Sequence, residues 1–497
     1  MLVLFFLLQL FSITLLGILI SFFPHKKSNN PISYPIIGCL ISFYKNRQRL
    51  LDWYTELLSS SPSQTIVVGR LGAPRTIVTT NPSNVEYVLK SNFVNFPKGK
   101  PFTEILGDLL GRGIFNVDGE LWSSQRKLAS HEFTTRSLRE FVVKVLEEEI
   151  NQKLVPILEE SVLRKTTLDL QDVLKRFAFD TICMVSLGWD PCCLDMSRPV
   201  PGLVRAFETA AKISAKRGSE PVFLVWKLKR LIGIGSERIL EKEVKLIHGY
   251  VSEIVKNKRK KLENVIKSGG GDLLSRLLLA GHDDDTVRDM MISFIMAGRD
   301  TTSAAMTWLF WLLSENSGVE NKIVDEVEGV ISKKGCLNYE ALQEMCYTKA
   351  CLCESMRLFP PVPWDSKHAE AADVLPDGTA VRRGDRVTYF PYGMGRMEEV
   401  WGKDCLEFKP NRWFDESGGD CKVLKPISPF KFPVFQAGPR VCLGKEMAFT
   451  QMKYVVASVL SRFEIKPIGL DRPVFVPLLT AHMAGGLKVK VEKRSGR

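Results

Sequence analysis

The stretch Phe435-Gln436-Ala437-Gly438-Pro439-Arg440-Val441-Cys442-Leu443-Gly444 places a cysteine on a glycine-bracketed loop directly before a helical pattern that starts at Lys445. A thiolate there would sit at a helix N-terminus, where unpaired backbone N–H groups and the helix dipole favour negative charge. Gly438 and Gly444 would let the backbone approach a flat ligand closely or adopt positive φ. Arg440 adds a cation suited to a carboxylate. The pattern predicts a cysteine that ligates haem iron, with an arginine for a haem propionate; the alternative is an inert, buried cysteine beside a turn.

The spacing F-x-x-G-x-R-x-C-x-G resembles the haem loop of the cytochrome P450 family. The resemblance implies a mainly α fold, in which a helical haem-binding domain carries small β-sheets. It also implies haem b as the cofactor, with Cys442 as the axial thiolate ligand of the iron. The other cofactor-binding positions on this loop would be Phe435, Gly438, Arg440 and Gly444. An axial thiolate pushes electron density onto iron and favours O–O bond cleavage.

Residues 1–23 are almost wholly apolar and long enough to cross a bilayer as a helix. They lack a basic n-region and an A-x-A-like cleavage site, which disfavours a cleaved signal peptide. His25, Lys26 and Lys27 follow, and the positive-inside rule places that side in the cytoplasm. We expect a transmembrane anchor over 1–23, a proline-rich hinge over 24–40 and a haem-thiolate catalytic domain over 41–497. The expected location is the endoplasmic reticulum membrane, with a single-pass anchor and the catalytic domain in the cytoplasm.

The charge of the chain indicates a class of partner. The 497 residues carry a formal net charge of +12, but Lys and Arg are spread out and no nucleic-acid-binding motif accompanies them, so we expect no nucleic acid partner. Lys425, Lys431 and Lys445 flank the haem loop and would attract an acidic flavoprotein, NADPH–cytochrome P450 reductase. Scattered solubility lysines are the alternative. No G-x-G-x-x-G unit follows a strand, so electrons would come from that partner.

The local patterns predict a mainly α chain with a small β portion. Residues 65–68 and 76–79 flank a glycine turn and predict a β-hairpin. The pattern is mostly helical from 82 to 370, and the alternation at 386–390 and 487–491 predicts strands. Eleven cysteines show neither a disulfide framework nor zinc-like spacing, which fits a reducing compartment.

A second motif, Ala297-Gly298-Arg299-Asp300-Thr301-Thr302, lies inside a long apolar helix that three aspartates open at 283–285. Glycine and paired threonines are poor helix formers, and such a departure in mid-helix often marks a functional site. Their hydroxyls can bond helix carbonyls and open a water-lined groove. A core helix with a packing glycine is the alternative. The run matches the family's A-G-x-D-T-T oxygen-binding motif, which implies that Thr301 holds water or oxygen and that Asp300 feeds protons inward.

Two further pairs match family motifs. Glu354 and Arg357 share one face of an apolar helix, and Arg412 of the P-x-R-[WF] segment would join them in a structural, not catalytic, ion cluster. Trp122 and Arg126 match the W-x-x-x-R helix and would face one haem propionate. A third propionate contact is usually an arginine after the proline pair. His368 falls at that place, so it is our candidate there.

The motifs stop at reaction class, and the substrate follows from a finer resemblance. The chain resembles plant fatty-acid ω-hydroxylases, and within that group most resembles jasmonoyl-L-isoleucine 12-hydroxylases. The runs that carry this resemblance are Ile105–Gly111, Gly113–Trp122, Arg176–Asp180, Ser186–Pro191, Tyr392–Arg396 and Pro477–Gly486. It implies an amphiphilic carboxylate substrate in an apolar pocket lined by Ile114, Phe115, Phe294, Ala297, Val362, Trp364, Leu479 and Thr480.

Three alternatives to terminal hydroxylation of jasmonoyl-isoleucine stay open on the sequence. The first is an ω-hydroxylase of medium- or long-chain fatty acids. The second is a haem-thiolate isomerase or dehydratase of lipid hydroperoxides, against which the intact Asp300 and Thr301 argue. The third is a haem-free scaffold anchored to the membrane.

Overall fold

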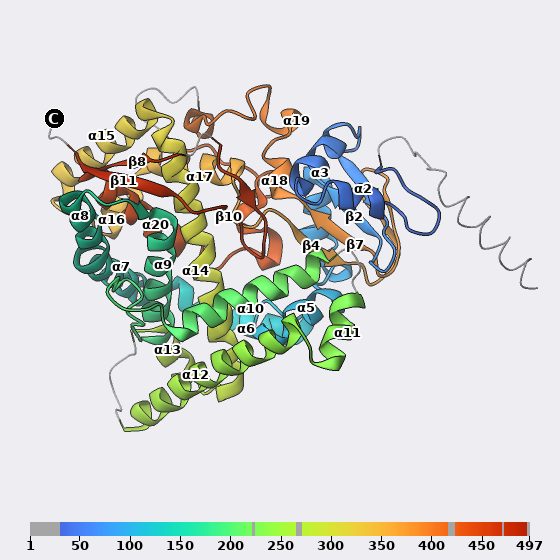
Figure 1. The fold of residues 1–497 in the computed structure, drawn as a ribbon, viewed down its shortest axis with the longest axis horizontal. Helices are drawn as coiled ribbons and strands as arrows, with labels where there is room; N and C mark the ends of the chain where they lie inside the picture. Colours follow the sequence, from blue (N-terminus) through green and yellow to red (C-terminus); the bar gives the residue numbers. More distant parts are fainter. Residues whose placement is uncertain (1–29, 221–223, 265–270, 416–422, 470–471, 495–497) are drawn as a thin grey trace, which may run out of the picture.

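The structure is a computed structural model, and it describes residues 30–220, 224–264, 271–415, 423–469 and 472–494. The transmembrane anchor expected over 1–23 and the first part of the hinge lie outside these ranges. Within them, no helix combines the length and apolar character that a bilayer crossing needs. The fold is mostly helical with small sheets, as expected (Figure 1).

The helices are numbered in chain order. The α-helices are α2 (Leu40–Lys45), α3 (Leu50–Ser59), α4 (Pro82–Glu86), α5 (Lys100–Leu110), α6 (Gly119–Thr134), α7 (Arg136–Glu149), α8 (Val155–Arg164), α9 (Leu170–Leu187), α10 (Gly202–Ser219), α11 (Leu224–Ile232), α12 (Ser236–Asn264), α13 (Leu273–Leu279), α14 (Asp284–Ser314), α15 (Ser317–Lys334), α16 (Tyr339–Glu344), α17 (Cys346–Leu358), α18 (Pro391–Met394), α19 (Glu398–Trp401) and α20 (Lys445–Leu460). Shorter 3₁₀ or π segments are η1 (Tyr87–Ser91), η2 (Phe93–Asn95), η3 (Ile150–Leu154), η4 (Pro410–Trp413), η5 (Pro433–Phe435) and η6 (Gly438–Arg440).

The main sheet has the order β1-β2-β7-β4 and lies beneath α2 and α3 at the right of Figure 1. The predicted hairpin is confirmed, since β1 (Thr65–Val68) and β2 (Thr76–Thr79) pair antiparallel. β2 pairs parallel with β7 (Arg386–Tyr389), which pairs antiparallel with β4 (Asp365–His368). Elsewhere β3 (Leu168–Asp169), β11 (Lys488–Lys493) and β8 (Phe463–Pro467) form a second sheet, and the pairs are β5 (Asp373–Val374) with β6 (Ala380–Val381) and β9 (Phe475–Val476) with β10 (His482–Met483).

The described part of the proline-rich segment packs on the β1–β2 hairpin. Gly38 bridges to Arg70, and Cys39 N donates to Gly69 O at 2.8 Å. Gly38 has φ +62°, and a Cβ there would lie 2.1 Å from Gly69 O, so only glycine fits this contact. The pairing brings Cys39 and α2 against the end of β1.

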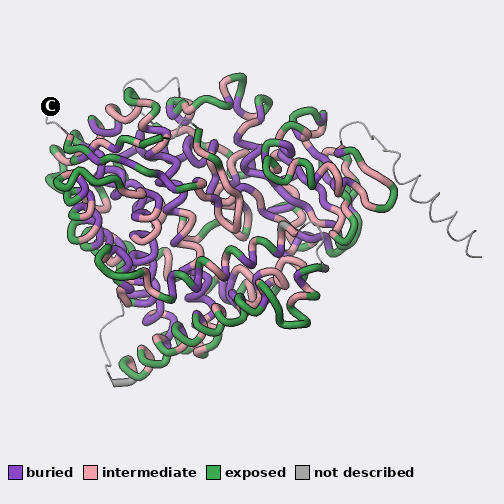
Figure 2. The backbone as a smooth tube through the Cα atoms, viewed as in Figure 1, coloured by how far each residue is buried: buried purple, intermediate pink, exposed green. Residues whose placement is uncertain are grey.

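The long helix expected after the aspartate run is α14, which crosses the middle of the molecule in Figure 1. Its N-cap is Asp283, whose side chain accepts from Thr286 N at 2.9 Å. Buried residues fill the interior around α14, whereas exposed ones line α12 at the lower edge of Figure 2. The helix therefore forms the axis on which the surrounding elements pack.

Gly298 of α14 makes room for a neighbouring helix. A Cβ at this position would lie 2.6 Å from two side-chain carbons of Ile182 in α9. The sequence left two interpretations of Gly298 open, close approach of a ligand and helix packing. The structure favours packing, because the space beyond Gly298 is filled by protein. Close packing of α9 on α14 therefore depends on the absence of a side chain at Gly298.

We expect Gly298→Ala to lower stability by about 1–3 kcal/mol, because the added methyl overpacks the contact with Ile182. The matched control is Gly329→Ala on the exposed face of α15, where a Cβ would meet nothing within 4 Å. There alanine should raise stability by about 0.5–1 kcal/mol through helix propensity. Thermal unfolding midpoints of both variants test the contrast, and equal shifts of one sign would contradict it.

Candidate functional site

The loop that carries Cys442 is closed by its own backbone. Cys442 N donates to Phe435 O at 2.8 Å, and the Phe435 ring packs on Phe449 of α20 with centroids 5.1 Å apart. Gly438 has φ +64°, and a Cβ there would lie 2.0 Å from Leu89 O, so this glycine serves packing against η1. Gly444 has φ −83°, and a Cβ there would make only ordinary contacts, at 4.0 Å, with Met447 and Phe133. The positive φ that we allowed for either glycine therefore occurs only at Gly438.

Cys442 is exposed, yet many protein atoms surround its thiol. Burial raises the pKa of its thiol above the ordinary value, while a hydrogen bond with Gly444 and the charges of Arg126 and Lys445 act to lower it. The protein surroundings without a bound metal therefore favour the neutral thiol. A metal ion at the sulfur would reverse this balance, because a coordinating thiol is deprotonated outright.

Arg440 lies against Trp122 of α6. Its guanidinium carbon is 4.4 Å from the centre of the Trp122 ring, and Nη2 donates to Asp118 Oδ1 at 2.5 Å and to Val117 O at 3.0 Å. Nε of Arg440 is buried without a hydrogen-bond partner. The loop and the start of α6 are thus joined by a cation that keeps one donor unused.

A buried charge network that the sequence did not reveal lies beside this loop. The Asp365 carboxylate accepts from Lys98 Nζ at 3.0 Å and Tyr389 Oη at 2.9 Å, and also from the side-chain amide of Gln436. Lys367 Nζ is 3.5 Å away. Burial raises the pKa of Asp365, but Lys367 and Lys98 outweigh it and hold that pKa well below its usual range. The sequence signal was the alternation of aspartate and lysine along β4.

The register of β4 separates Lys367 from His368. Lys367 shares the Asp365 face and is fully buried, and burial lowers its pKa to about 7. His368 points to the other face, where its Nδ1 lies 2.5 Å from Lys98 O. Burial lowers the pKa of His368 to about 4, so it is neutral. Of the two side chains, the structure therefore places Lys367, not our candidate His368, on the face of the network that adjoins the Cys442 loop.

The mid-helix motif forms a partly accessible stripe in the otherwise buried α14. Met296, Ala297, Asp300 and Thr301 are half-buried, while most residues around them are buried. Thr301 Oγ1 donates to Ala297 O at 2.7 Å, and Thr302 Oγ1 donates to Gly298 O at 2.7 Å. The prediction that the threonine hydroxyls bond helix carbonyls is confirmed. Phe133 of α6 links this helix to the Cys442 loop, since its ring lies 5.4 Å from Phe294 and borders Gly444.

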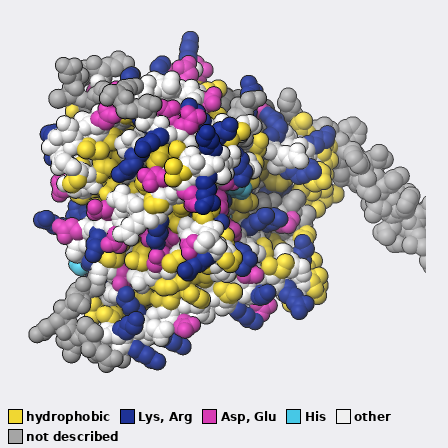
Figure 3. Space-filling view, turned by 60° about the vertical axis from the view of Figure 1, so that its left-hand side comes forward, with side chains coloured by type: hydrophobic (Ala, Val, Ile, Leu, Met, Phe, Trp, Pro, Cys, Tyr) yellow, Lys and Arg dark blue, Asp and Glu magenta, His cyan; other side chains and the backbone are white. Residues whose placement is uncertain are grey.

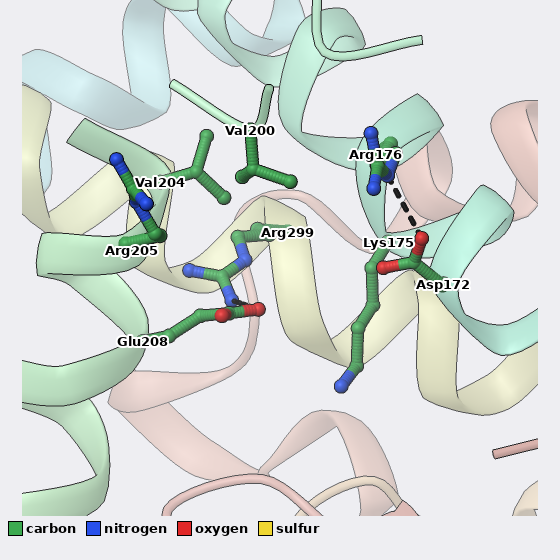
Figure 4. Close-up of a pocket in the computed structure, with 8 residues that line it drawn as sticks. All are labelled: Asp172, Lys175, Arg176, Val200, Val204, Arg205, Glu208 and Arg299. Carbon is green, nitrogen blue, oxygen red and sulfur yellow. Dashed lines mark hydrogen bonds and ion pairs between the residues drawn. The ribbon is translucent and has the colours of Figure 1, made fainter. Parts of the chain in front are cut away.

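Asp300 is held by an ion pair at the edge of a cavity. Arg299 Nε lies 3.0 Å from Asp300 Oδ1, and Arg299 Nη2 lies 2.9 Å from Glu208 Oε1. The cavity, of about 250 Å³, opens between α9, α10 and α14, and Figure 4 shows Arg299 directed at Glu208 inside it. Lys175, Arg205 and Arg299 all line this cavity. Its lining is therefore charged up to Arg299, the ion-pair partner of Asp300.

The candidate pocket residues are divided between two apolar clusters and a set outside both. Ile114, Phe115, Phe294 and Leu479 join one apolar cluster, and Trp364 packs on another that includes Phe390. Ala297, Val362 and Thr480 are half-buried and belong to neither cluster. A hydrogen bond from Ala481 N to Pro361 O, 2.8 Å long, brings the C-terminal turn beside the segment that follows α17.

The flanking lysines do not form one exposed patch. Lys445 is exposed, whereas Lys425 and Lys431 are half-buried, and Lys431 Nζ lies 4.8 Å from the centre of the Trp401 ring. On the face shown in Figure 3, Lys and Arg are interspersed with Asp and Glu.

The structure brings Glu354, Arg357 and Arg412 together. Both side chains of the α17 pair are fully buried. Glu354 accepts from Arg357 Nε and Nη2, each at 2.8 Å, and from Arg412 Nε at 2.7 Å. Trp413 Nε1 and Lys409 N also donate to it, each at 2.9 Å. The carboxylate is therefore saturated with donors, as a buried charge requires.

These residues fit a haem ligated by Cys442. Cys442 is exposed and not packed into the core, which leaves room for an iron ligand to be reached. Arg440 Nε is buried and lacks a partner, and the fully buried Lys367 lies in its neighbourhood, so both can receive propionate carboxylates. Arg126, near the Cys442 thiol, adds a third cation.

Comparisons with known proteins agree with this fit. The model of the cytochrome P450 family, described as Cytochrome P450, matches residues 29–483. Cytochrome P450 94B1 of Arabidopsis thaliana is 66% identical over 471 residues, which cover 94% of this chain and 92% of the relative. Cytochrome P450 94B3 of the same plant is 66% identical over 498 residues, covering 99% and 98%. Cytochrome P450 94A2 of Vicia sativa is 46% identical over 480 residues, covering 95% and 93%.

We expect Glu354→Gln to cost about 3–5 kcal/mol, because two arginines would be left buried without their carboxylate. The control is Glu407→Gln in the same region, whose side chain is 67% exposed and reaches Lys409 only at 3.9 Å; it should change stability by less than about 0.5 kcal/mol. Unfolding midpoints and the yield of haem-loaded protein measure both. A Glu354→Gln protein as stable as the control would contradict the structural role of this ion cluster.

Proposed function

The chain belongs to the cytochrome P450 family, and we propose that it hydroxylates the terminal (ω) carbon of jasmonoyl-L-isoleucine, a 12-hydroxylation that would turn over a plant hormone. The family makes it a haem-thiolate monooxygenase that takes electrons from a redox partner. The observation that carries the reaction class is the exposed Cys442 in a closed loop beside Arg440, whose buried Nε has no hydrogen-bond partner. The substrate rests on the finer sequence resemblance and on the apolar lining.

We assign the cofactor contacts as follows. Cys442 would ligate the iron, and Arg440, Arg126, Trp122 and Lys367 would hold the propionates; Lys367 replaces His368 in this set because of the strand register. When bound, the haem supplies reductive activation of O₂ and insertion of one oxygen atom into a C–H bond. The protein contributes the ligand, the counter-charges and a closed apolar site around them.

Proton delivery is the proposed role of the α14 stripe. The Thr301 hydroxyl donates to Ala297 O, so its oxygen is free to accept from water on the half-buried face. Asp300 can exchange protons with water when its ion pair with Arg299 opens, since the cavity beside Arg299 reaches solvent. This pair of an acid and a hydroxyl would pass protons toward the reacting oxygen.

The substrate would lie with its alkyl end toward Cys442. Phe294, Ile114 and Leu479 supply an apolar wall that excludes water from that end, and they offer no charged partner for a carboxylate. The acid group must therefore be bound elsewhere.

We also propose that residues 1–23 anchor the chain in the endoplasmic reticulum membrane, with residues 24–40 as a hinge to the catalytic domain. NADPH–cytochrome P450 reductase would dock near Lys445.

A competition experiment tests the substrate. Membranes containing the protein, reductase and NADPH are offered jasmonoyl-isoleucine together with a medium-chain fatty acid. We expect the conjugate to be hydroxylated at its terminal carbon in preference to the fatty acid. Preference for the fatty acid would instead support the general ω-hydroxylase alternative, for which the apolar wall is equally suited. Product formed without reductase and O₂ would contradict a monooxygenase of either kind.

We expect Asp300→Asn and Thr301→Ala to lower the turnover rate by roughly a hundredfold, because each removes a group that moves protons. Substrate affinity should stay close to that of the wild type, and less product should form per NADPH consumed. Asp285→Asn, the same change at an 84% exposed position on this helix, is the matched control. Unchanged coupling of NADPH to product in both variants would contradict the role.

A further inference from the structure

Arg70 and Arg386 lie close enough on the outer face of the main sheet for their positive charges to interact. Val68, Thr76, Arg386 and His368 form one row across β1, β2, β7 and β4. Arg386 Nε donates to Thr76 Oγ1 at 3.2 Å. Arg70 follows two residues after β1, with its guanidinium carbon 3.9 Å from the centre of the Phe43 ring. We call Arg70 and Arg386 the arginine pair.

No acid neutralises the arginine pair within the part of the chain that the structure describes. The nearest carboxylate in sequence, Asp385, is bound by Arg75 and by Arg382 N. Nη1 of Arg70 is buried without a hydrogen-bond partner. Burial and the charge of Arg70 lower the pKa of Arg386 to about 10. Both residues are half-buried. Like charges in such a setting repel, and charges withdrawn from water are normally paired, so the arginine pair calls for an anion.

The neighbouring groups do not supply that anion. Tyr54 lies close, but burial raises the pKa of its hydroxyl to about 12, so it is neutral. Cys39 is likewise protonated, because burial raises the pKa of its thiol. His368 is neutral, with Nε2 buried and unpartnered. The pair therefore keeps its positive charge in a setting of aromatic and apolar groups.

The sheet face that carries Arg386 leads to the candidate substrate pocket. Side chains alternate along a strand, so Phe390, Thr388 and Arg386 share one face. Opposite them stand Trp364, Ser366 and His368. Trp364 packs on Phe390 with ring centroids 6.2 Å apart, and Ser366 Oγ lies 2.8 Å from Thr388 Oγ1. Four residues of strand place the arginine pair roughly 13 Å from the Trp364 end.

We propose that Arg386, supported by Arg70, binds the carboxylate of the amphiphilic substrate and thereby determines which end reaches Cys442. The inference rests on the proposed function and adds the specificity-determining residue that the apolar wall lacks. A guanidinium matches a carboxylate in a planar, two-hydrogen-bond geometry, and a partly buried site strengthens that contact. Holding the acid one strand length away would leave the far alkyl carbon as the reacting one.

Holoenzyme with its haem tests this by titration of the substrate-induced change in the haem spectrum, repeated by equilibrium dialysis. The ligands are jasmonoyl-isoleucine, a medium-chain fatty acid, and the methyl ester of each. We expect Arg386→Gln to weaken binding of the acids by roughly tenfold to a hundredfold and to leave the esters within about twofold. Arg386→Lys should restore most of the affinity for the acids.

Arg383→Gln is the matched control, because it removes an exposed arginine from the turn before β7. Arg70→Gln, which keeps the Arg386–Thr76 bond, is a second variant in case Arg386→Gln does not load haem, and it should weaken the acids in the same sense. Acids bound as tightly by both variants as by the wild type, or acids and esters weakened together, would overturn the proposal. A wild type that binds the fatty acid but not the conjugate would overturn only the hormone assignment, since the fatty acid and its ester still decide the role of Arg386.

Discussion

The buried carboxylate of Glu354 is the constraint that holds together the elements leading to the Cys442 loop. It fixes Arg357 and Arg412, and Arg357 in turn donates to the carbonyls of Gly395, Cys405 and Glu407. One ion cluster thus joins α17, η4 and the coil between them, in a setting where each lost partner would strand a charge. Trp413 extends the cluster, because its ring packs on Phe432 with centroids 4.9 Å apart, just before η5 and the Cys442 loop.

Side chains alternate along β4 and β7, and this places two sets of charged groups on opposite faces of the main sheet. One face of β4 and β7 carries Asp365, Lys367 and Tyr389, which adjoin the Cys442 loop through Gln436. The other face carries His368 and Arg386, beside the apolar cluster that includes Phe43. A shift of one residue in register would exchange these faces. The same short strands can therefore hold counter-charges for a cofactor on one side and an acid-binding cation on the other.

Sequence reasoning succeeded where a pattern is local and failed where partners decide. The aspartates at the start of α14, the hairpin and the carbonyl-bonded threonines follow from periodicity and side-chain chemistry, and the structure has them. Counting from the proline pair selected His368, whereas strand pairing puts Lys367 on the network face. Gly298 looked like a ligand contact as much as a packing residue, and only the position of Ile182 in α9 distinguished them. The cations Lys98 and Arg70 carried no motif at all.

The sequence by itself determined the reaction class, because a cysteine, an arginine and glycines at fixed spacing lie on one continuous loop and form a pattern that can be recognised without knowing which distant residues meet. It also determined the helical character and the presence of an acid and a hydroxyl on α14. Only the tertiary structure decided which charges meet. Asp365 and Lys98, and likewise Arg70 and Arg386, are hundreds of residues apart, and pairing of strands and loops alone brings each pair together. Electrostatic roles depend on distance and burial, which the fold fixes.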